Sequence, residues 1–456
     1  MHADDNYLQN ALGRRVYGAA MASSRLWIAL PFAALVAANG CSKGSGGGSA
    51  TGGAGSTGSG GNTGTAGQTG VAGQGASGSN GAAGQAGAGA GGTGTAGQTA
   101  GGGSTGQAGA GGAAVVPPTG PCAPPADIYS PIDKLSQTGC MDPVTLTKFV
   151  SRAVPYEVNS PLWSDGANKS RAFVLPASGK IHVKDCQANP SECPQGAADD
   201  GKWVFPVGTV MIKNFMFDGK FVETRLFMHQ SDDAMMGWVG YGYEWNEAQT
   251  EATIAPDSRD TKMFNTGMRT VTWNYPSRMD CLTCHDYRGG STIGPETAQL
   301  NRMVGTANQL DTFAAMNLFE TPPAKPYKAA LLLPYSGQLG TADMTAATLD
   351  ARARSYMHAN CSFCHRPQGQ FPNFDLRFDT PLAMAGICNV ATKKTAPTIT
   401  ATKIMVPADH ADSAMWQRAH SMTGDNGRMP AIGSYVVDDM GVQVIADWID
   451  SITTCP

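Results

Sequence analysis

Charge is missing from a long N-terminal stretch of this 456-residue chain. No charged side chain occurs from Gly44 to Ala126, where almost every residue is glycine, alanine, serine, threonine or glutamine. Such a segment has almost nothing apolar of any size to bury, so it cannot offset the entropy lost on ordering. The composition predicts a disordered Gly-rich linker over 42–120 and excludes this part from the folded core.

A long hydrophobic run is also missing from the leader of the chain. Leu26–Ala38 has thirteen apolar residues, whereas a membrane-spanning helix needs about 20. The run matches the hydrophobic region of a secretory signal, and the small residues before Cys41 resemble the lipobox of bacterial lipoproteins. We expect a signal peptide and lipobox over 1–41, with Met21 as an alternative start and Cys41 as the lipidated residue. The other interpretation is an ordinary signal peptide cleaved nearby.

An excess of one charge sign is likewise absent. The chain has 32 Lys and Arg against 36 Asp and Glu, for a net charge of -4. This near balance argues against nucleic acid as a partner and shows no basic ring for docking an acidic protein. We expect membrane contact through a lipid anchor at Cys41 only. Because Ser42 follows it, the resemblance to lipoproteins implies the outer membrane.

Two C-x-x-C-H pentapeptides, 281–285 and 361–365, carry the strongest chemical signal. Two thiols three positions apart can add to the vinyl groups of haem, and the adjoining imidazole can bind the iron. Half of a thiolate zinc site is the alternative, but it does not need a histidine after the second cysteine both times. The sequence predicts two covalently bound haem c groups, attached at Cys281, Cys284, Cys361 and Cys364, with His285 and His365 as iron ligands.

The remaining cysteines agree with export. Eleven cysteines, less Cys41 and the four haem thiols, leave six. An even number in an oxidising compartment suggests three disulfides. Nearness in sequence favours Cys122 with Cys140 and Cys186 with Cys193, which leaves Cys388 for Cys455, although the other pairings stay open.

The C-terminal part, 340–456, has a helical pattern. Thr348–Asn360 reads as a helix that runs into Cys361, and a second helix with one apolar face follows Asp438-Asp439, which can cap it. An opening helix, a haem motif and a closing amphipathic helix resemble an all-α class I cytochrome c domain carrying the second haem.

The loop Gly427–Gly433 contains a Met-Pro pair. It resembles the loop that supplies the axial methionine in class I cytochromes c, which implies Met429 as the sixth ligand of the second haem. His420 and Met422 are rival ligands, and Met429 could instead be a core residue. A thioether ligand favours ferrous iron and raises the potential, so we expect a low-spin electron carrier here.

Residues 121–335 have a strand pattern. Thr209–Phe217 and Phe221–Met228 alternate in polarity and are joined by Asp218-Gly219, a hairpin signal, and Trp238–Trp245 suggests another strand. The first haem motif follows this pattern directly. The expected fold class is therefore α+β multidomain, with an antiparallel β-rich domain that ends in a haem motif and an all-α cytochrome c domain after it.

Four segments carry a family resemblance: Pro161–Arg171, Trp203–Lys213, Tyr275–Arg278 and Ala359–His365. They resemble an exported bacterial dihaem c-type cytochrome family, over about Tyr129 to Cys455. The β domain with its terminal haem motif is also similar to the β-sheet cytochromes c-prime and their hydroxylamine-oxidising relatives. Those relatives have a five-coordinate haem, but no catalytic residue can be carried over to this chain.

The sixth ligand of the first haem is left open by the sequence. The candidates are scattered: Met303, Met316, His229, Met211 and Met263. If one binds, this haem is a second electron carrier, and if none does, the iron can bind nitric oxide, peroxide or hydroxylamine. Four cations could contact haem propionates or pair with acids such as Glu223: Arg171, Lys213, Arg225 and Arg278.

The function that these patterns favour is one-electron transfer by an exported, lipid-anchored dihaem c-type cytochrome, with an unknown redox donor and acceptor protein as partners. The alternative is a haem enzyme, a peroxidase or small-nitrogen-species oxidoreductase, acting at an open first haem. A secreted structural module that carries haem is a third possibility, favoured only by the long linker.

Overall fold

The computed structural model describes residues 121–456 except 195, 259, 268, 334–345 and 423–426. The expected signal peptide over 1–41 and linker over 42–120 lie outside the described residues, and so does the expected boundary between 335 and 340. The described residues all belong to one compact unit. No helix among them is long and apolar enough to cross a membrane.

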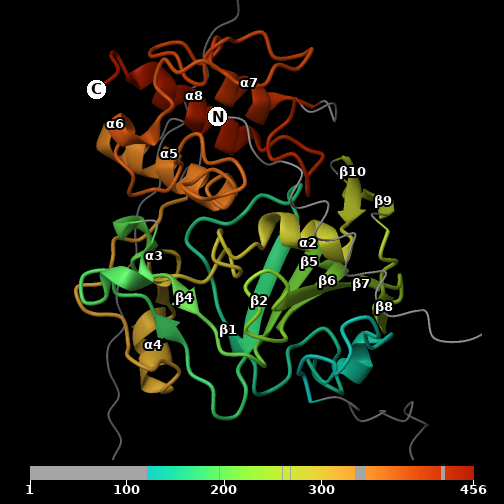
Figure 1. Ribbon diagram of the computed structural model, residues 1–456. Helices are drawn as coiled ribbons and strands as arrows, with labels where there is room; N and C mark the ends of the chain where they lie inside the picture. Colours follow the sequence, from blue (N-terminus) through green and yellow to red (C-terminus); the bar gives the residue numbers. More distant parts are fainter. Residues whose placement is uncertain (1–120, 195, 259, 268, 334–345, 423–426) are drawn as a thin grey trace, which may run out of the picture. The chain divides into compact units, whose positions relative to one another are not determined.

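A six-stranded antiparallel sheet forms the centre of the first part (Figure 1). Its strands, in spatial order, are β1 (Val154–Pro155), β2 (Asn168–Val174), β5 (Val210–Phe217), β6 (Lys220–His229), β7 (Trp238–Trp245) and β8 (Ala252–Ile254). Asp218 and Gly219 join β5 to β6 with φ angles of 48° and 77°, as a two-residue hairpin turn requires. The predicted hairpin and the predicted aromatic strand are both confirmed.

Both faces of this sheet are buried. Successive side chains of a strand point to opposite sides, and the side chains on each side belong to a different apolar cluster. On one face Ile212, Leu226 and Tyr241 pack against the segment that contains the Cys122–Cys140 disulfide. On the other face Met211 and Phe227 belong to a second apolar cluster. Lys213 lies two residues after Met211, and so faces the same side.

Short elements surround the sheet. The hairpin β9 (Asp260–Asn265) and β10 (Thr270–Tyr275) leads directly into helix α2 (Arg278–Cys284). Ser277 and Asp280 close the start of α2 with reciprocal hydrogen bonds, a capping box. The other elements are η1 (Leu135–Thr138), β3 (His182–Val183), η2 (Pro190–Glu192), η3 (Ala197–Asp199), β4 (Trp203–Val204), α3 (Thr297–Leu300), β11 (Met303–Val304), β12 (Ala307–Asn308) and α4 (Gln309–Ala315).

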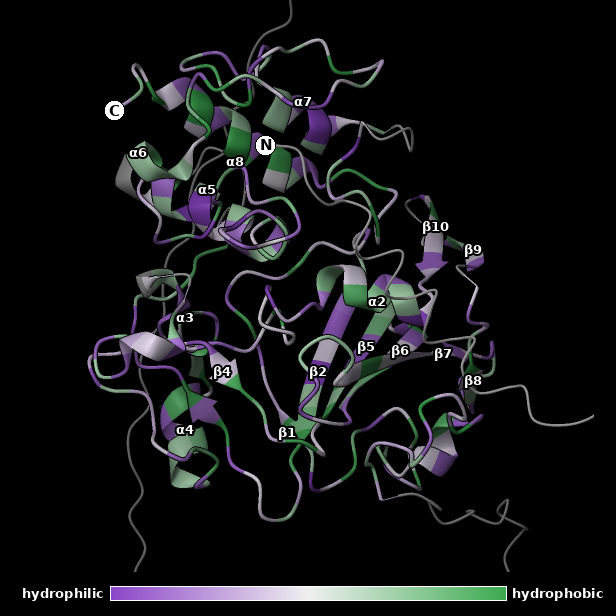
Figure 2. Ribbon diagram, in the orientation of Figure 1, coloured by the Kyte–Doolittle hydropathy of each residue, from purple (hydrophilic) through white to green (hydrophobic). Residues whose placement is uncertain are grey.

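The C-terminal part contains α5 (Ala346–Asn360), α6 (Leu382–Ala385), α7 (Ala414–His420) and α8 (Asp439–Ser451). Asp438 caps α8 by accepting a hydrogen bond from the Gly441 N–H, 3.2 Å away. Helix α8 carries both apolar and polar stretches (Figure 2), and its apolar residues pack with α5 in one core. Gly441 makes this packing possible, because a Cβ there would overlap the ring of Tyr356. The two helices expected from the sequence are confirmed.

The expected class I cytochrome c domain is nevertheless wrong, because no all-α domain is evident in the described residues and the chain is mostly β-rich with a few helices. The four C-terminal helices have 15, 4, 7 and 13 residues. Five prolines interrupt residues 366–413, and proline breaks helices. Much of this stretch pairs instead through isolated β-bridges, such as Cys388 with Met405.

All three disulfides form as nearness in sequence suggested. Cys122 is bonded to Cys140, Cys186 to Cys193 and Cys388 to Cys455. The four cysteines of the two C-x-x-C-H motifs are free thiols. This division into bonded and free cysteines matches the predicted one for every cysteine that the structure describes.

Candidate haem attachment site

The first motif lies on the sheet through a close approach at Gly240. Helix α2 carries Cys281 and Cys284, and Gly240 belongs to β7. A Cβ added at Gly240 would lie 2.5 Å from the Cys281 Sγ atom, closer than real contacts allow. Sequence reasoning missed this role, although a glycine inside an aromatic strand signals a close approach.

His285 ends α2 and is held in one orientation. Its Nδ1 atom donates to the Ser291 carbonyl oxygen at 2.7 Å, and its ring centre lies 4.4 Å from that of Phe227. Burial lowers the pKa of His285 to about 4, so the imidazole is neutral at pH 7. The Nε2 atom is therefore free of a proton and suited to bind a metal.

A cavity of about 170 Å³ adjoins this motif. Its wall includes Cys281, Cys284 and His285, together with residues of the sheet and of the C-terminal part. The sheet contributes apolar side chains such as Met211 and Phe227, beside several cations. Free thiols, a neutral imidazole, apolar walls and cations are the groups that suit a flat apolar ring bearing two carboxylates, so these residues fit a haem.

The candidate sixth ligands of the first haem differ in their exposure and in whether they line the cavity. Met211 lines the cavity and is 7% exposed, whereas Met263, Met303 and Met316 are 77%, 58% and 51% exposed. His229 stacks on Trp238 and its Nδ1 atom donates to a backbone carbonyl. Of the five candidates, Met211 alone is part of the described cavity wall.

The second motif follows α5, whose last residue is Asn360. The ring of His365 stacks on Phe374 with centres 4.3 Å apart and an angle of 11° between planes. Burial lowers the pKa of His365 to about 4, so this imidazole is also neutral at pH 7. Trp416 packs against the same core as Cys361, and its buried Nε1 atom has no hydrogen-bond partner among the described residues.

All four motif thiols are protonated in this chain. Burial raises their pKa values, to about 11 for Cys281 and Cys364 and about 12 for Cys284 and Cys361. Nucleophilic cysteines need the thiolate, which an environment of this kind disfavours. The described residues include no group of three or more His, Cys, Asp or Glu that could hold a metal ion.

The structure distinguishes Met429 from its two rivals. Met422 is 70% exposed, and His420 is exposed and stacked on Trp416. Met429 is half-buried, and its N–H donates to the Arg418 carbonyl oxygen at 3.0 Å. Among the three candidates, Met429 is thus the one side chain that is not exposed.

The two motifs meet at Gly289. A Cβ added there would lie 3.3 Å from the Cys284 carbonyl oxygen and 3.2 Å from that of Phe363. Phe363 stands between the two cysteines of the second motif, is 8% exposed, and also lines the cavity of the first motif. After burial, the nearby thiol of Cys364 is the largest cause of the raised pKa of Cys284. Sequence reasoning could not detect this contact, since no local pattern links the motifs.

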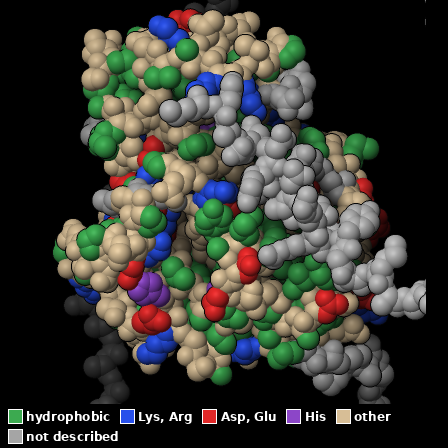
Figure 3. Space-filling model, in the orientation of Figure 1, with side chains coloured by type: hydrophobic (Ala, Val, Ile, Leu, Met, Phe, Trp, Pro, Cys, Tyr) green, Lys and Arg blue, Asp and Glu red, His purple; other side chains and the backbone are tan. Residues whose placement is uncertain are grey.

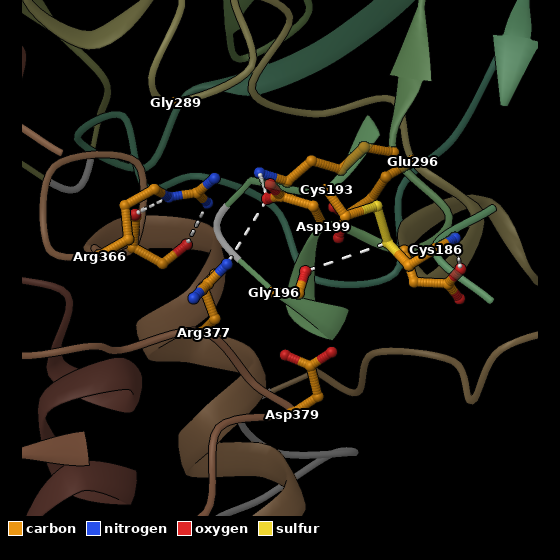
Figure 4. Close-up of polar contacts among 12 residues, drawn as sticks. Cys186, Cys193, Gly196, Asp199, Gly289, Glu296, Arg366, Arg377 and Asp379 are labelled. Carbon is orange, nitrogen blue, oxygen red and sulfur yellow. Dashed lines mark hydrogen bonds and ion pairs between the residues drawn. A yellow bond between two sulfur atoms is a disulfide. The ribbon is translucent and has the colours of Figure 1, made fainter. Parts of the chain in front are cut away.

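A buried charged cluster links the two parts of the chain near this contact (Figure 4). Asp199 accepts from Lys202 at 2.8 Å and lies 3.5 Å from Arg377. Burial alone would raise the pKa of Asp199, but these cations outweigh it and lower that pKa. Arg366, which follows His365, is 2% exposed and donates to the Ser362 carbonyl oxygen. The pair of Asp199 with Arg377 joins η3 to the segment that follows the second motif.

Two of the four candidate propionate contacts are already paired. Arg225 binds Glu223 through two hydrogen bonds of 2.8 Å, and Arg278 binds Asp257 at 2.6 Å. Arg171 and Lys213 line the cavity. Arg225 lines the same cavity although it is paired, so the two sequence-based alternatives, a pairing with acids and a place in this cavity, both hold for Arg225.

Comparisons of the chain with models of protein families, with curated proteins and with solved structures find no match. The assignment of the site consequently depends on the two motifs and on the geometry around them. That geometry brings together both motifs, which the sequence places 80 positions apart from Cys281 to Cys361.

Proposed function

We propose that the protein is an exported dihaem c-type cytochrome that transfers single electrons. The haems would be attached at Cys281 and Cys284 and at Cys361 and Cys364, and each bound haem iron would accept or release one electron. The observation that supports this function best is the contact between the motifs at Gly289. Two attachment sites that both lie against one glycine suit passage of an electron from one to the other within one chain.

The residues around each motif support this role. His285 and His365 are neutral and each packs against an aromatic ring, so each can donate a nitrogen lone pair to iron without first losing a proton. The Ser291 carbonyl fixes which nitrogen of His285 is available. Phe363 of the second motif is 8% exposed and forms part of the wall of the first cavity.

The cellular location and the redox partners of the protein are part of the same proposal. Three disulfides agree with folding in an oxidising compartment. We infer a periplasmic or cell-surface location with a lipid anchor at Cys41, and redox proteins as electron donor and acceptor. Lys and Arg, Asp and Glu, and apolar side chains are interspersed on the face shown in Figure 3, so docking there would depend little on long-range steering.

Haem content and redox titration test this function. The full chain is expressed with a cytochrome c maturation system, denatured and weighed, and the native protein is titrated with a reductant. We expect a mass increase of two haems that survives denaturation, and two one-electron reductions per chain. A chain without covalent haem would contradict the proposal.

Replacing Met429 by alanine is expected to lower the reduction potential of one haem and leave the other nearly unchanged, because a thioether ligand favours ferrous iron. The weak near-infrared band of a sulfur-ligated ferric haem should disappear at the same time. Met422→Ala is the matched control, since Met422 is 70% exposed. If the band and both potentials persist in Met429→Ala, the ligand is another residue.

A second candidate function, enzymatic chemistry at an open first haem, is favoured by the cavity beside His285. If Met211 does not bind the iron, carbon monoxide should bind the reduced protein at about one haem per chain, and at about two in Met429→Ala. Optical titration measures both ratios. Failure of carbon monoxide to bind the unchanged protein would exclude the open site and leave a two-centre electron carrier.

A further inference from the structure

Three cations form a row across neighbouring strands of the sheet. Arg171 on β2 pairs in register with Lys213 on β5, which pairs in register with Arg225 on β6. All three side chains line the cavity of the first motif. Like charges directly opposite each other on a sheet destabilise it, so this row has a cost that something must offset.

The charges of the row are unevenly compensated. Glu223, which is fully buried, neutralises Arg225 through two hydrogen bonds and also accepts one from the Trp273 Nε1–H at 3.0 Å. Neither Arg171 nor Lys213 forms a side-chain hydrogen bond or ion pair with any residue that the structure describes. The Lys213 ammonium lies 5.0 Å from the centre of the Phe215 ring. These two cations of the cavity wall thus have no directly bonded anion, and the acids that act on them, Glu157 for Arg171 and Glu223 for Lys213, do so without a hydrogen bond.

The next row of the same sheet face is apolar. Its members, again in register across β2, β5, β6 and β7, are Phe173, Met211, Phe227 and Gly240. Gly240 is the residue on which the Cys281 thiol lies. Adjacent strands are about 4.8 Å apart, so Lys213 and Arg171 lie two and three strands away from β7. Arg225 lies on β6, next to β7, and is the member of the row that Glu223 neutralises. The two cations without a bonded anion are therefore the two that lie farther from β7.

We propose that Arg171 and Lys213 form a binding site for a carboxylate or a small oxyanion inside the first cavity. Both side chains are half-buried. A partly desolvated cation without a hydrogen-bonded anion is costly, and an anion that accepts hydrogen bonds from both groups would reduce that cost. The anion has two sources. It is either a propionate of a haem attached at Cys281 and Cys284, whose carboxylates project from the edge opposite the thioether bonds, or a free anion from solution. The first source rests on the proposed function, and the second does not.

The sign of a stability change tests the site. Lys213→Met deletes the charge at similar length, Lys213→Arg retains it, and Lys220→Met is the matched control, because Lys220 lies exposed at the start of β6. If an anion is bound, Lys213→Met should lower the melting temperature of the two-haem protein by several degrees, while Lys213→Arg and Lys220→Met leave it nearly unchanged. If no anion is bound, deleting one of two opposed cations should leave the melting temperature unchanged or raise it, which would overturn the proposal. Arg171→Gln provides a second variant, with the same expectation.

Sodium formate, compared with sodium chloride at equal ionic strength, separates the two sources. A free-anion site predicts that formate raises the melting temperature of the unchanged protein and not that of Lys213→Met. A propionate site predicts no response to formate, together with a lowered potential of one haem in Lys213→Met, since a lost cation disfavours the reduced form. If the chain carries no haem, the proposed function fails, yet the formate comparison on that haem-free chain still decides the anion site. If neither the formate response nor the change in haem potential occurs, the proposed anion site is wrong.

Discussion

A chain in which Cys361 and Cys364 are both replaced by alanine is expected to carry one covalent haem instead of two. Replacing Cys281 and Cys284 together should remove the other haem, because each pair supplies the two thioether bonds that attach one porphyrin. The mass of the denatured protein and the haem absorbance per chain measure the loss.

The disulfide cysteines provide the control for this experiment. Cys388→Ala with Cys455→Ala removes two cysteines that are bonded to each other and belong to neither motif. Loss of a native disulfide typically costs about 2–5 kcal/mol in stability, but both haems should stay attached. Retention of two haems after removal of either motif pair would refute the assignment of that pair.

Replacing Gly240 by valine should prevent attachment of the first haem and leave the second in place. A Cβ at this position would lie 2.5 Å from the Cys281 Sγ atom and 2.9 Å from its Cβ atom, so the thiol must move from its position on the sheet. Overpacking of a well-packed site costs about 1–3 kcal/mol. Valine has a high strand propensity, so the loss would report the lack of space and not a poor strand. Haem content and the melting temperature measure both effects.

Gly294→Ala is the matched control for this substitution. Gly294 also lines the first cavity, but a Cβ added there would meet no atom within 4 Å. This variant should keep two haems and nearly unchanged stability. A Gly240→Val chain that carries two haems with unaltered spectra would show that the contact with Cys281 does not govern attachment.

Features that depend on neighbouring residues could be predicted from the sequence. The β5–β6 hairpin follows from alternating polarity and from Asp218-Gly219, and helix α8 from its apolar face and its cap at Asp438. The disulfide pairs followed from nearness in sequence, and the two haem motifs are contiguous pentapeptides. In each case the residues that decide the structure lie close together along the chain.

Features that depend on distant residues could not be predicted. The expected all-α domain is wrong because an opening and a closing helix do not determine the stretch between them, which contains five prolines and forms bridges such as Cys388 with Met405. The cationic row depends on the pairing register of three strands, which no local pattern in the sequence gives. Of the partners of the row, the sequence suggested only Glu223. The contact of Gly289 with Phe363 joins residues with no shared local pattern.

The position of Phe363 limits how the chain can be divided. This one side chain belongs to the second motif by sequence and to the wall of the first cavity by position. Ala359 and Pro430 also line that cavity, so a fragment that ends before α5 would lose this side of the wall and open the first site to water. Each half of the folded chain is in this sense incomplete, and neither is an interchangeable module that could be moved to another protein with its site intact.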